Sequence, residues 1–185
     1  MTFKEIITRQ RELYLTDLLD FYKERTSGVR EVMLELNKEE PIPIFKTYRL
    51  DHYDQKDGQS KPTELNSDKY LDFDPINFEF GSLNIELNPF YWNGCEFILN
   101  PKPADLNWLI LWAKKWIDVE ENKSEDENGL TGVVHNVTKP SETEIGYSFS
   151  VDFGTADSEA FFELLDELAD QDVKELRIGS FSMMD

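Results

Sequence analysis

The stretch CEFILNPKPADLNWLILWAKKWID, residues 95–118, decides the fold, because its apolar pattern changes from that of a strand to that of a helix. The short apolar run Cys95–Leu99 predicts a buried strand. The apolar residues that follow recur at helical spacing, and Pro103 near the first position predicts a helix over about 103–118. A strand thus leads directly into a helix.

The chain beyond this stretch continues the alternation. Strands are predicted at 130–138 and 144–153, a helix at about 157–170 with Asp157 as N-cap, and a last strand at 173–179. This β-α-β-β-α-β order resembles the ferredoxin-like split βαβ unit. The resemblance covers about half of the chain and implies a fold only, because this fold hosts many unrelated functions.

The N-terminal part predicts a helix and two strands. Thr2 and Glu5 form a capping box at the start of a helix over 2–25, in which each side chain satisfies a free backbone donor. Strands are expected at about 29–36 and 43–50.

Between these strands and residue 95 the sequence predicts a polar loop and a β-meander. Residues 51–68 have no hydrophobic period and are expected to form a long loop. Gly81-Ser82 and Asn93-Gly94 are typical of tight hairpin turns. The whole chain, 1–185, is expected to be one α+β domain with an antiparallel-rich sheet and helices on one side. Its sub-parts are 1–68, 69–94 and 95–185.

The charge of the chain narrows the range of partners. Its 185 residues include 38 Asp and Glu but 19 Lys and Arg, which gives a net charge of −19. Phosphates and anionic membranes attract basic surfaces, so neither nucleic acid nor membrane is expected as a partner. A basic protein or a cation is the natural counterpart. A single cysteine and the absence of a signal-peptide pattern favour a cytoplasmic protein.

Most of the excess acid falls in two segments. Segment 118–128 has a net charge of −5 and segment 152–172 has −8. In the predicted topology these segments meet at one end of the sheet, where they form a candidate surface for a basic partner. A solvated face without a partner is the alternative. The acidic candidates are Glu120, Glu121, Glu125, Asp126, Glu127, Glu159, Glu163, Asp166 and Asp170.

Aromatic residues could extend that surface. Trp108, Trp112 and Trp116 recur at intervals of four and give the helix a wider apolar arc than one sheet covers. They pack against another helix, or they form an exposed Trp surface suited to protein binding. Tyr91 and Trp92, next to the Asn93-Gly94 turn, are similar candidates.

Catalytic and metal-binding patterns are weak. Cys95 has only His52 and His135 as possible bases, and all three are interpreted as ordinary structural residues. Residues 51–64 do not satisfy an EF-hand, and weak cation binding at Asp51, Asp54 and Asp57 is a minor alternative. No cofactor or metal is expected.

Two functions of different class follow. The first is a non-catalytic module that binds a basic protein, for example an inhibitor or immunity-type protein acting on a toxin or nuclease. The second is a small-molecule-binding domain or small enzyme with its site near the 51–68 loop. A further alternative is an assembly component that forms a homodimer through the sheet edge or the Trp-bearing helix.

Overall fold

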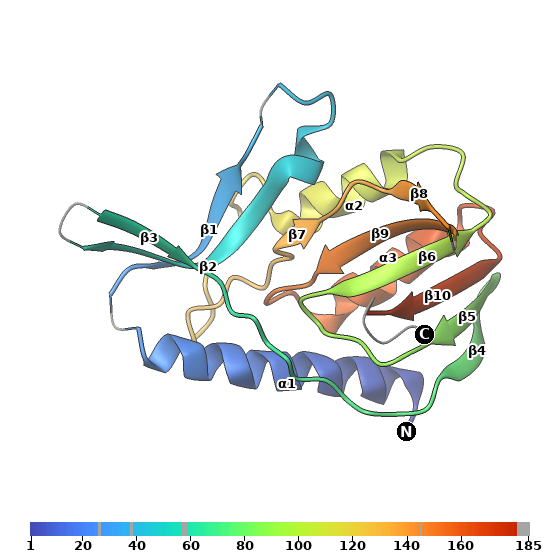
Figure 1. The fold of residues 1–185 in the computed structure, drawn as a ribbon, viewed down its shortest axis with the longest axis horizontal. Helices are drawn as coiled ribbons and strands as arrows, with labels where there is room; N and C mark the ends of the chain where they lie inside the picture. Colours follow the sequence, from blue (N-terminus) through green and yellow to red (C-terminus); the bar gives the residue numbers. More distant parts are fainter. Residues whose placement is uncertain (26, 38, 57–58, 145, 181–185) are drawn as a thin grey trace.

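The computed structural model contains one ten-stranded sheet, against which the helices pack (Figure 1). The structure describes residues 1–25, 27–37, 39–56, 59–144 and 146–180, and of 55, 56, 59 and 60 only the backbone. The strands are β1 (Val29–Glu35), β2 (Thr47–Lys56), β3 (Gln59–Thr63), β4 (Ile76–Phe80), β5 (Leu83–Leu87), β6 (Cys95–Asn100), β7 (Asn136–Val137), β8 (Ser141–Thr143), β9 (Gly146–Asp152) and β10 (Glu175–Gly179). The helices are α1 (Phe3–Lys23), α2 (Asn107–Ile117), α3 (Ser158–Ala169) and the short 3-10 helix η1 (Pro43–Lys46).

The strands pair in the order β1-β2-β7-β9-β6-β10-β5-β4, with β3 on β2 and β8 on β9. Only β10 and β5 are parallel among the paired strands of the described residues. The predicted α+β class with an antiparallel-rich sheet is therefore confirmed. The join between β2 and β7 is narrow, because one residue pair, Tyr48 and Asn136, forms its described ladder.

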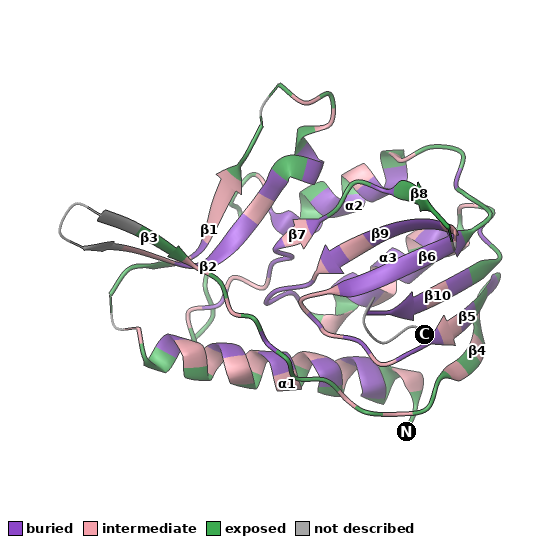
Figure 2. Ribbon diagram, in the orientation of Figure 1, coloured by how far each residue is buried: buried purple, intermediate pink, exposed green. Residues whose placement is uncertain are grey.

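The core lies between the sheet and the helices. Alternate residues of β6 and β9 face α2 and α3, and Phe97 stacks on Phe149 with ring centroids 5.2 Å apart. In Figure 1, α2 and α3 lie behind the sheet and α1 runs along its lower edge, where Phe3 contacts Phe161 of α3. Figure 2 shows the buried residues concentrated on the central strands and on the facing sides of the helices.

Several local predictions are confirmed. The Thr2–Glu5 capping box begins α1. Gly81-Ser82 forms the turn between β4 and β5. The second predicted turn is displaced by one residue: Trp92 and Asn93 form it, and the bridge from Tyr91 to Gly94 closes it. These features depend on residues close in sequence, so local pattern is sufficient to find them.

The predicted long loop over 51–68 is wrong. β2 continues to Lys56 and β3 pairs back with it, so that His52 lies opposite Thr63. The ribbon extends beyond the core (Figure 1) and is polar on both sides, so it lacks the apolar alternation by which a strand is recognised. Asp57, one of the weak cation candidates, lies outside the described residues.

Three other boundaries differ from the predictions. The strand expected over 43–50 begins as η1 and becomes β2 only at Thr47. The strand expected over 130–138 shrinks to Asn136–Val137, because the Val134 amide donates to the Trp116 carbonyl, 2.9 Å away, instead of joining a ladder. Pro103 does not begin α2: the helix begins at Asn107, whose amide donates to the Asp105 carboxylate, 2.8 Å away.

Gly154 allows the turn after β9 to approach His135. Its φ is +48°, and a Cβ atom there would lie 2.1 Å from Cδ2 of the imidazole. Gly132 also has a positive φ, +69°, but a Cβ atom there would meet no atom within 4 Å. Substitution of Gly132 therefore tests backbone strain alone, whereas substitution of Gly154 adds steric overlap with His135.

Gly154→Ala is expected to destabilise the protein more than Gly132→Ala. Both variants place an L-residue in the left-handed region, at about 1–2 kcal/mol. Only Gly154→Ala also displaces His135, at an additional ~1–3 kcal/mol. Urea unfolding of the two variants measures the difference, and equal losses would contradict the close packing of residue 154 on the imidazole.

Candidate functional site

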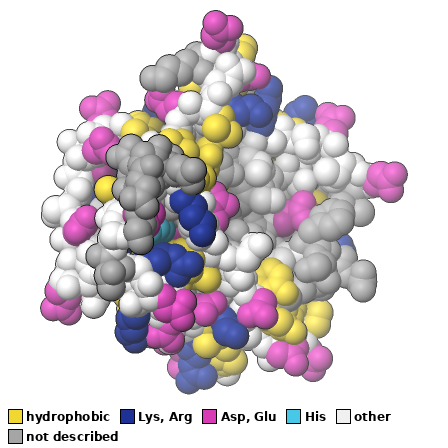
Figure 3. Space-filling view, turned by 60° about the vertical axis from the view of Figure 1, so that its left-hand side comes forward, with side chains coloured by type: hydrophobic (Ala, Val, Ile, Leu, Met, Phe, Trp, Pro, Cys, Tyr) yellow, Lys and Arg dark blue, Asp and Glu magenta, His cyan; other side chains and the backbone are white. Residues whose placement is uncertain are grey.

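The acidic segment that follows α2 lies at the surface. The five predicted acids of this segment are all exposed: Glu120, Glu121, Glu125, Asp126 and Glu127. On the face seen in Figure 3, Asp and Glu side chains are spread around the outline of the molecule, and several Lys and Arg side chains lie nearer the middle. Residues 118–128 are thus one dense part of a generally acidic surface.

Two carboxylates of this acidic loop shape its backbone. Asp118 accepts hydrogen bonds from the amides of Asn122 and Lys123, 3.0 and 2.9 Å away. Asp126 accepts from the amides of Leu130 and Asn128, 3.0 and 2.8 Å away, and these bonds lower its pKa. Since Asp118 and Asp126 hold the turns, the glutamates between them are presented by an ordered backbone.

Basic side chains attach the loop to the body. Lys123 Nζ donates to the Gly132 carbonyl, 2.5 Å away, and lies 4.6 Å from the Trp116 ring centroid. Arg30 Nη1 of β1 donates to the Asn128 carbonyl, 2.9 Å away. The loop is therefore fixed to both the end of α2 and the N-terminal strands.

The chain just after the loop, at Gly132 and Val133, contacts the turn before α3. The amides of Gly132 and Val133 donate to Thr155 Oγ1, 3.0 and 3.1 Å away. On α3, Glu159, Asp166 and Asp170 are exposed. Glu163 is half-buried and pairs with Lys115 of α2, Nζ to Oε2 2.5 Å, so its charge is compensated within the chain.

Of the two alternatives for the Trp residues of α2, packing against another helix is confirmed and the exposed surface is wrong. Trp108, Trp112, Trp116 and Trp92 are buried, with at most 7% of any of them exposed. Trp112 donates to the Ala160 carbonyl of α3, 3.1 Å away, while Lys123 covers Trp116. The wide apolar arc of α2 is therefore covered by α3 and by the chain that follows α2.

Tyr91 is half-buried and lies edge-on to Tyr70, with ring centroids 5.6 Å apart. Tyr70 itself is 41% exposed. Of the aromatic candidates, Tyr91 alone retains surface for a partner, and its role stays a prediction.

A buried ionic network joins the N-terminal strands to the rest of the sheet. His135 Nε2 lies 3.1 Å from Glu31 Oε1, and its Nδ1 lies 3.3 Å from Asp51 Oδ1. Each of the three side chains is at most 6% exposed. Glu31 also accepts hydrogen bonds from Thr155 Oγ1 and from the amide and hydroxyl of Thr131.

The network is charged. Burial raises the pKa of Glu31, but hydrogen bonds from His135, Thr155 and Thr131, with the imidazolium charge, outweigh burial and lower it to about 2. Burial lowers the pKa of His135, but bonds to Asp51 and Glu31 raise it well above its ordinary value. His135 is thus an imidazolium held between two carboxylates. The sequence contains no local pattern for this set, because its members lie far apart along the chain.

Arg49 strengthens the same junction. Its guanidinium donates to the carbonyls of Glu31, Ile117 and Asp118, each 2.9 Å away. Two of these carbonyls end α2, where a cation favours the helix dipole. Arg49 therefore offsets the acids that follow the helix and ties β2 to it.

The residues considered for nucleophilic chemistry lie in structural positions. Cys95 is fully buried in the core, and burial raises its pKa well above the ordinary value. His52 Nε2 lies 2.7 Å from the Ser27 carbonyl. His52 also lines a cavity of about 310 Å³ with Arg25, Arg30 and Glu125.

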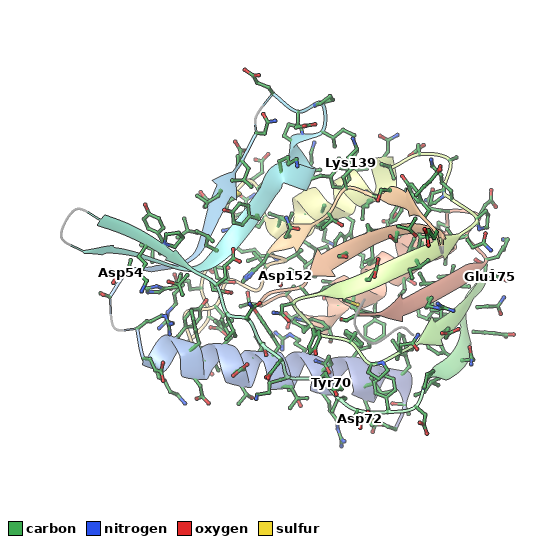
Figure 4. All side chains as sticks on the ribbon, viewed as in Figure 1. Asp54, Tyr70, Asp72, Lys139, Asp152 and Glu175 are labelled. Carbon is green, nitrogen blue, oxygen red and sulfur yellow. The ribbon has the colours of Figure 1, made fainter. Side chains whose placement is uncertain are left out.

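A second cavity, of about 420 Å³, lies where β2, β7 and β9 meet. Asp152 lies at the end of β9 (Figure 4). It lines the cavity together with Tyr48, Glu64, Asn93 and Asn136. Burial raises the pKa of Asp152 to about 7; the charges of Asp51 and Glu64 add to this, while His135 opposes it. This cleft collects polar groups from distant parts of the chain.

Comparison with known proteins assigns neither a family nor a function to the chain. No family model matches the chain, and no curated protein or solved structure matches it.

Within the described ranges, no group of three or more His, Cys, Asp or Glu side chains is arranged to hold a metal ion. No described helix is both long and apolar enough to cross a membrane.

Glu31→Gln is expected to destabilise the protein by ~3–5 kcal/mol at pH 7, because it leaves a buried imidazolium without one of its counterions. The lowered pKa of Glu31 means that its charge stabilises the fold above pH 4.5 and that this contribution is lost as the pH falls toward 2. The difference in the free energy of unfolding between Glu31→Gln and the native protein should therefore shrink as the pH falls from 4.5 toward 2.

Urea unfolding at pH 7 and at pH 3 measures this loss. Glu12→Gln, on the exposed side of α1, is the matched control and should change stability little at either pH. A Glu31→Gln deficit that stays constant from pH 7 to pH 3 would contradict the ionised network.

Proposed function

We propose that this protein is a non-catalytic acidic module that binds a basic protein partner. The observation that carries the proposal is the ordered acidic loop of residues 118–128, whose glutamates are exposed while Asp118 and Asp126 hold its backbone. An exposed carboxylate cluster on a chain of net charge −19 favours cationic partners and accelerates their association.

The pairing within the loop supports this function. Glu120, Glu125 and Glu127 form no ion pair within the described residues, and Glu121 Oε1 approaches Arg49 Nη1 only to 4.0 Å. These charges are therefore available to lysine and arginine side chains of a partner. Glu159, Asp166 and Asp170 on α3 extend the acidic surface.

Order in the loop supports binding as well. A loop that is already held by hydrogen bonds loses less conformational entropy on association than a flexible acidic tail does. The anchors Asp118 and Asp126 and the attachments through Lys123 and Arg30 provide that order.

A concrete form of this function is an inhibitor or immunity-type protein that neutralises a basic toxin or nuclease, with carboxylates in the place of nucleic-acid phosphates. The proposal includes a cytoplasmic location, supported by a single, buried cysteine. It includes neither nucleic acid nor membrane as a partner, because the chain carries a large negative charge.

The proposal extends to the fold of the C-terminal half, as a ferredoxin-like unit. The order β7-β9-β6-β10, with α2 after β6 and α3 after β9, supports this interpretation. The short β7 and the additional strand β8 are departures from a regular unit of this kind.

Neutralising the loop is expected to weaken partner binding about ten- to a hundredfold, because each exposed charge contributes a fraction of a kcal/mol to binding. The loop variant carries Glu→Gln at 120, 121, 125 and 127 and leaves both anchors intact. The immobilised native protein first captures basic proteins from native lysate at low salt. The affinity of the main captured protein is then measured for each variant at low and high salt.

The matched control carries Glu12→Gln, Glu39→Gln, Asp72→Asn and Asp74→Asn, which remove the same number of exposed charges elsewhere. It should bind nearly as the native protein does. If both variants weakened partner binding equally, net charge alone would explain the effect and the loop would have no specific role. Partner binding that is insensitive to salt would also contradict the proposal.

A further inference from the structure

The cleft around Asp152 has a chemistry distinct from that of the acidic loop. Asp152 shares the sheet face of Ser150, opposite to the buried side chains of Phe149 and Val151, so the cleft opens on the face that the helices leave uncovered. Its lining brings Glu64 and Asn93, which precede β6, beside Tyr48 of β2 and Asn136 of β7.

The amide and carboxylate side chains of the cleft offer free acceptor oxygens, beside the hydroxyls of Tyr48, Thr138 and Ser150, which can both donate and accept. Each of the two amide side chains donates one N–H to the protein: Asn93 to the Leu65 carbonyl, 3.4 Å away, and Asn136 to the Thr47 carbonyl, 3.3 Å away. Their side-chain oxygens remain unused by the described residues. These oxygens favour a ligand that donates hydrogen bonds.

Two carboxylates add further acceptor oxygens to the cleft. Asp152 Oδ1 accepts from the Gly154 amide, 2.9 Å away, and within the described residues Oδ2 has no hydrogen-bond or ion-pair partner. Glu64 is exposed and likewise has no such partner in the described part of the chain. Arg49 also lines the cleft, but its guanidinium is committed to the carbonyls of Glu31, Ile117 and Asp118.

A guanidinium group matches this arrangement. It is a planar cation with five N–H donors and no acceptor, it pairs with carboxylates through two parallel bonds, and it stacks on aromatic rings such as that of Tyr48. An ammonium group has three donors and no flat face. The charge of a cation also offsets the cost of partly burying Asp152.

We propose that the cleft lined by Tyr48, Glu64, Asn93, Asn136 and Asp152 binds the guanidinium group of a small alkylguanidine. The inference does not rest on the proposed protein partner, because the acidic loop contributes no residue to the cleft. It places a second binding site at the junction of β2, β7 and β9.

Proton linkage gives the site a recognisable signature. The pKa of Asp152 is raised to about 7, so the carboxylate gains its charge as the pH rises from 6 to 8. The charged groups near it are Asp51, Glu64, His135 and Arg49, which lines the same cleft, and Asp51 and Glu31 hold His135 as a cation. Tyr14 of α1 also interacts with Asp152, but burial raises the pKa of Tyr14 and keeps it neutral over this interval. Guanidinium affinity should therefore rise over this pH interval, with release of a proton on binding below pH 7.

The test is calorimetric titration of the full chain with n-butylguanidine and with n-butylurea, its neutral analogue. The urea should bind at least about tenfold more weakly, because it carries no charge and fewer donors. Asp152→Asn and Glu64→Gln should each weaken n-butylguanidine binding, by about ten- to a hundredfold for Asp152→Asn. Asp152→Asn should also remove the rise in affinity between pH 6 and pH 8.

Two controls complete the design. Asp166→Asn on the exposed side of α3 and the loop variant at 120, 121, 125 and 127 should both bind n-butylguanidine as the native protein does. Because Glu64 is exposed, Glu64→Gln tests the cleft even if Asp152→Asn fails to fold. Equal binding of the urea, or native affinity in Glu64→Gln and Asp152→Asn alike, would overturn the proposal.

Discussion

The imidazolium of His135, held between Glu31 and Asp51, is the interaction on which the assembly of this fold depends. The backbone ladder between β2 and β7 consists of one described pair, Tyr48 and Asn136, which is too little to fix the N-terminal strands by itself. The buried ions supply the missing specificity, because a charge in the interior is stable only where its counterions and hydrogen bonds are in place.

The surroundings of this network are adapted to it. Gly154 is compatible with the imidazole because it has no side chain, and Thr155, next in the chain, donates its hydroxyl to Glu31. The same hydroxyl accepts the amides that hold the start of the chain segment after the acidic loop. The order of that loop and the geometry of the Asp152 cleft thus share one junction, although no residue of the loop lines the cleft.

Local pattern accounts for much of the fold and for part of the site. The capping box at Thr2 and the turn at Gly81-Ser82 are recognisable because their determinants lie within a few residues. The polar ribbon of β2 and β3 was not recognisable, since neither side of it is apolar. The pattern leaves the position of the Trp side chains of α2 open for a related reason: helical spacing shows a wide apolar arc but not what covers it.

The sequence by itself determined the sign and density of the charge, the exposed acids of residues 118–128, and the periodic elements of the C-terminal half. Only the tertiary structure decided which ionised groups meet. Glu31, Asp51 and His135 are separated by 20 and 84 positions along the chain. Periodicity describes neighbours along one element, whereas an ion pair between elements depends on how the elements pack, and the same packing brings Glu64, Asn93 and Asp152 around one cleft.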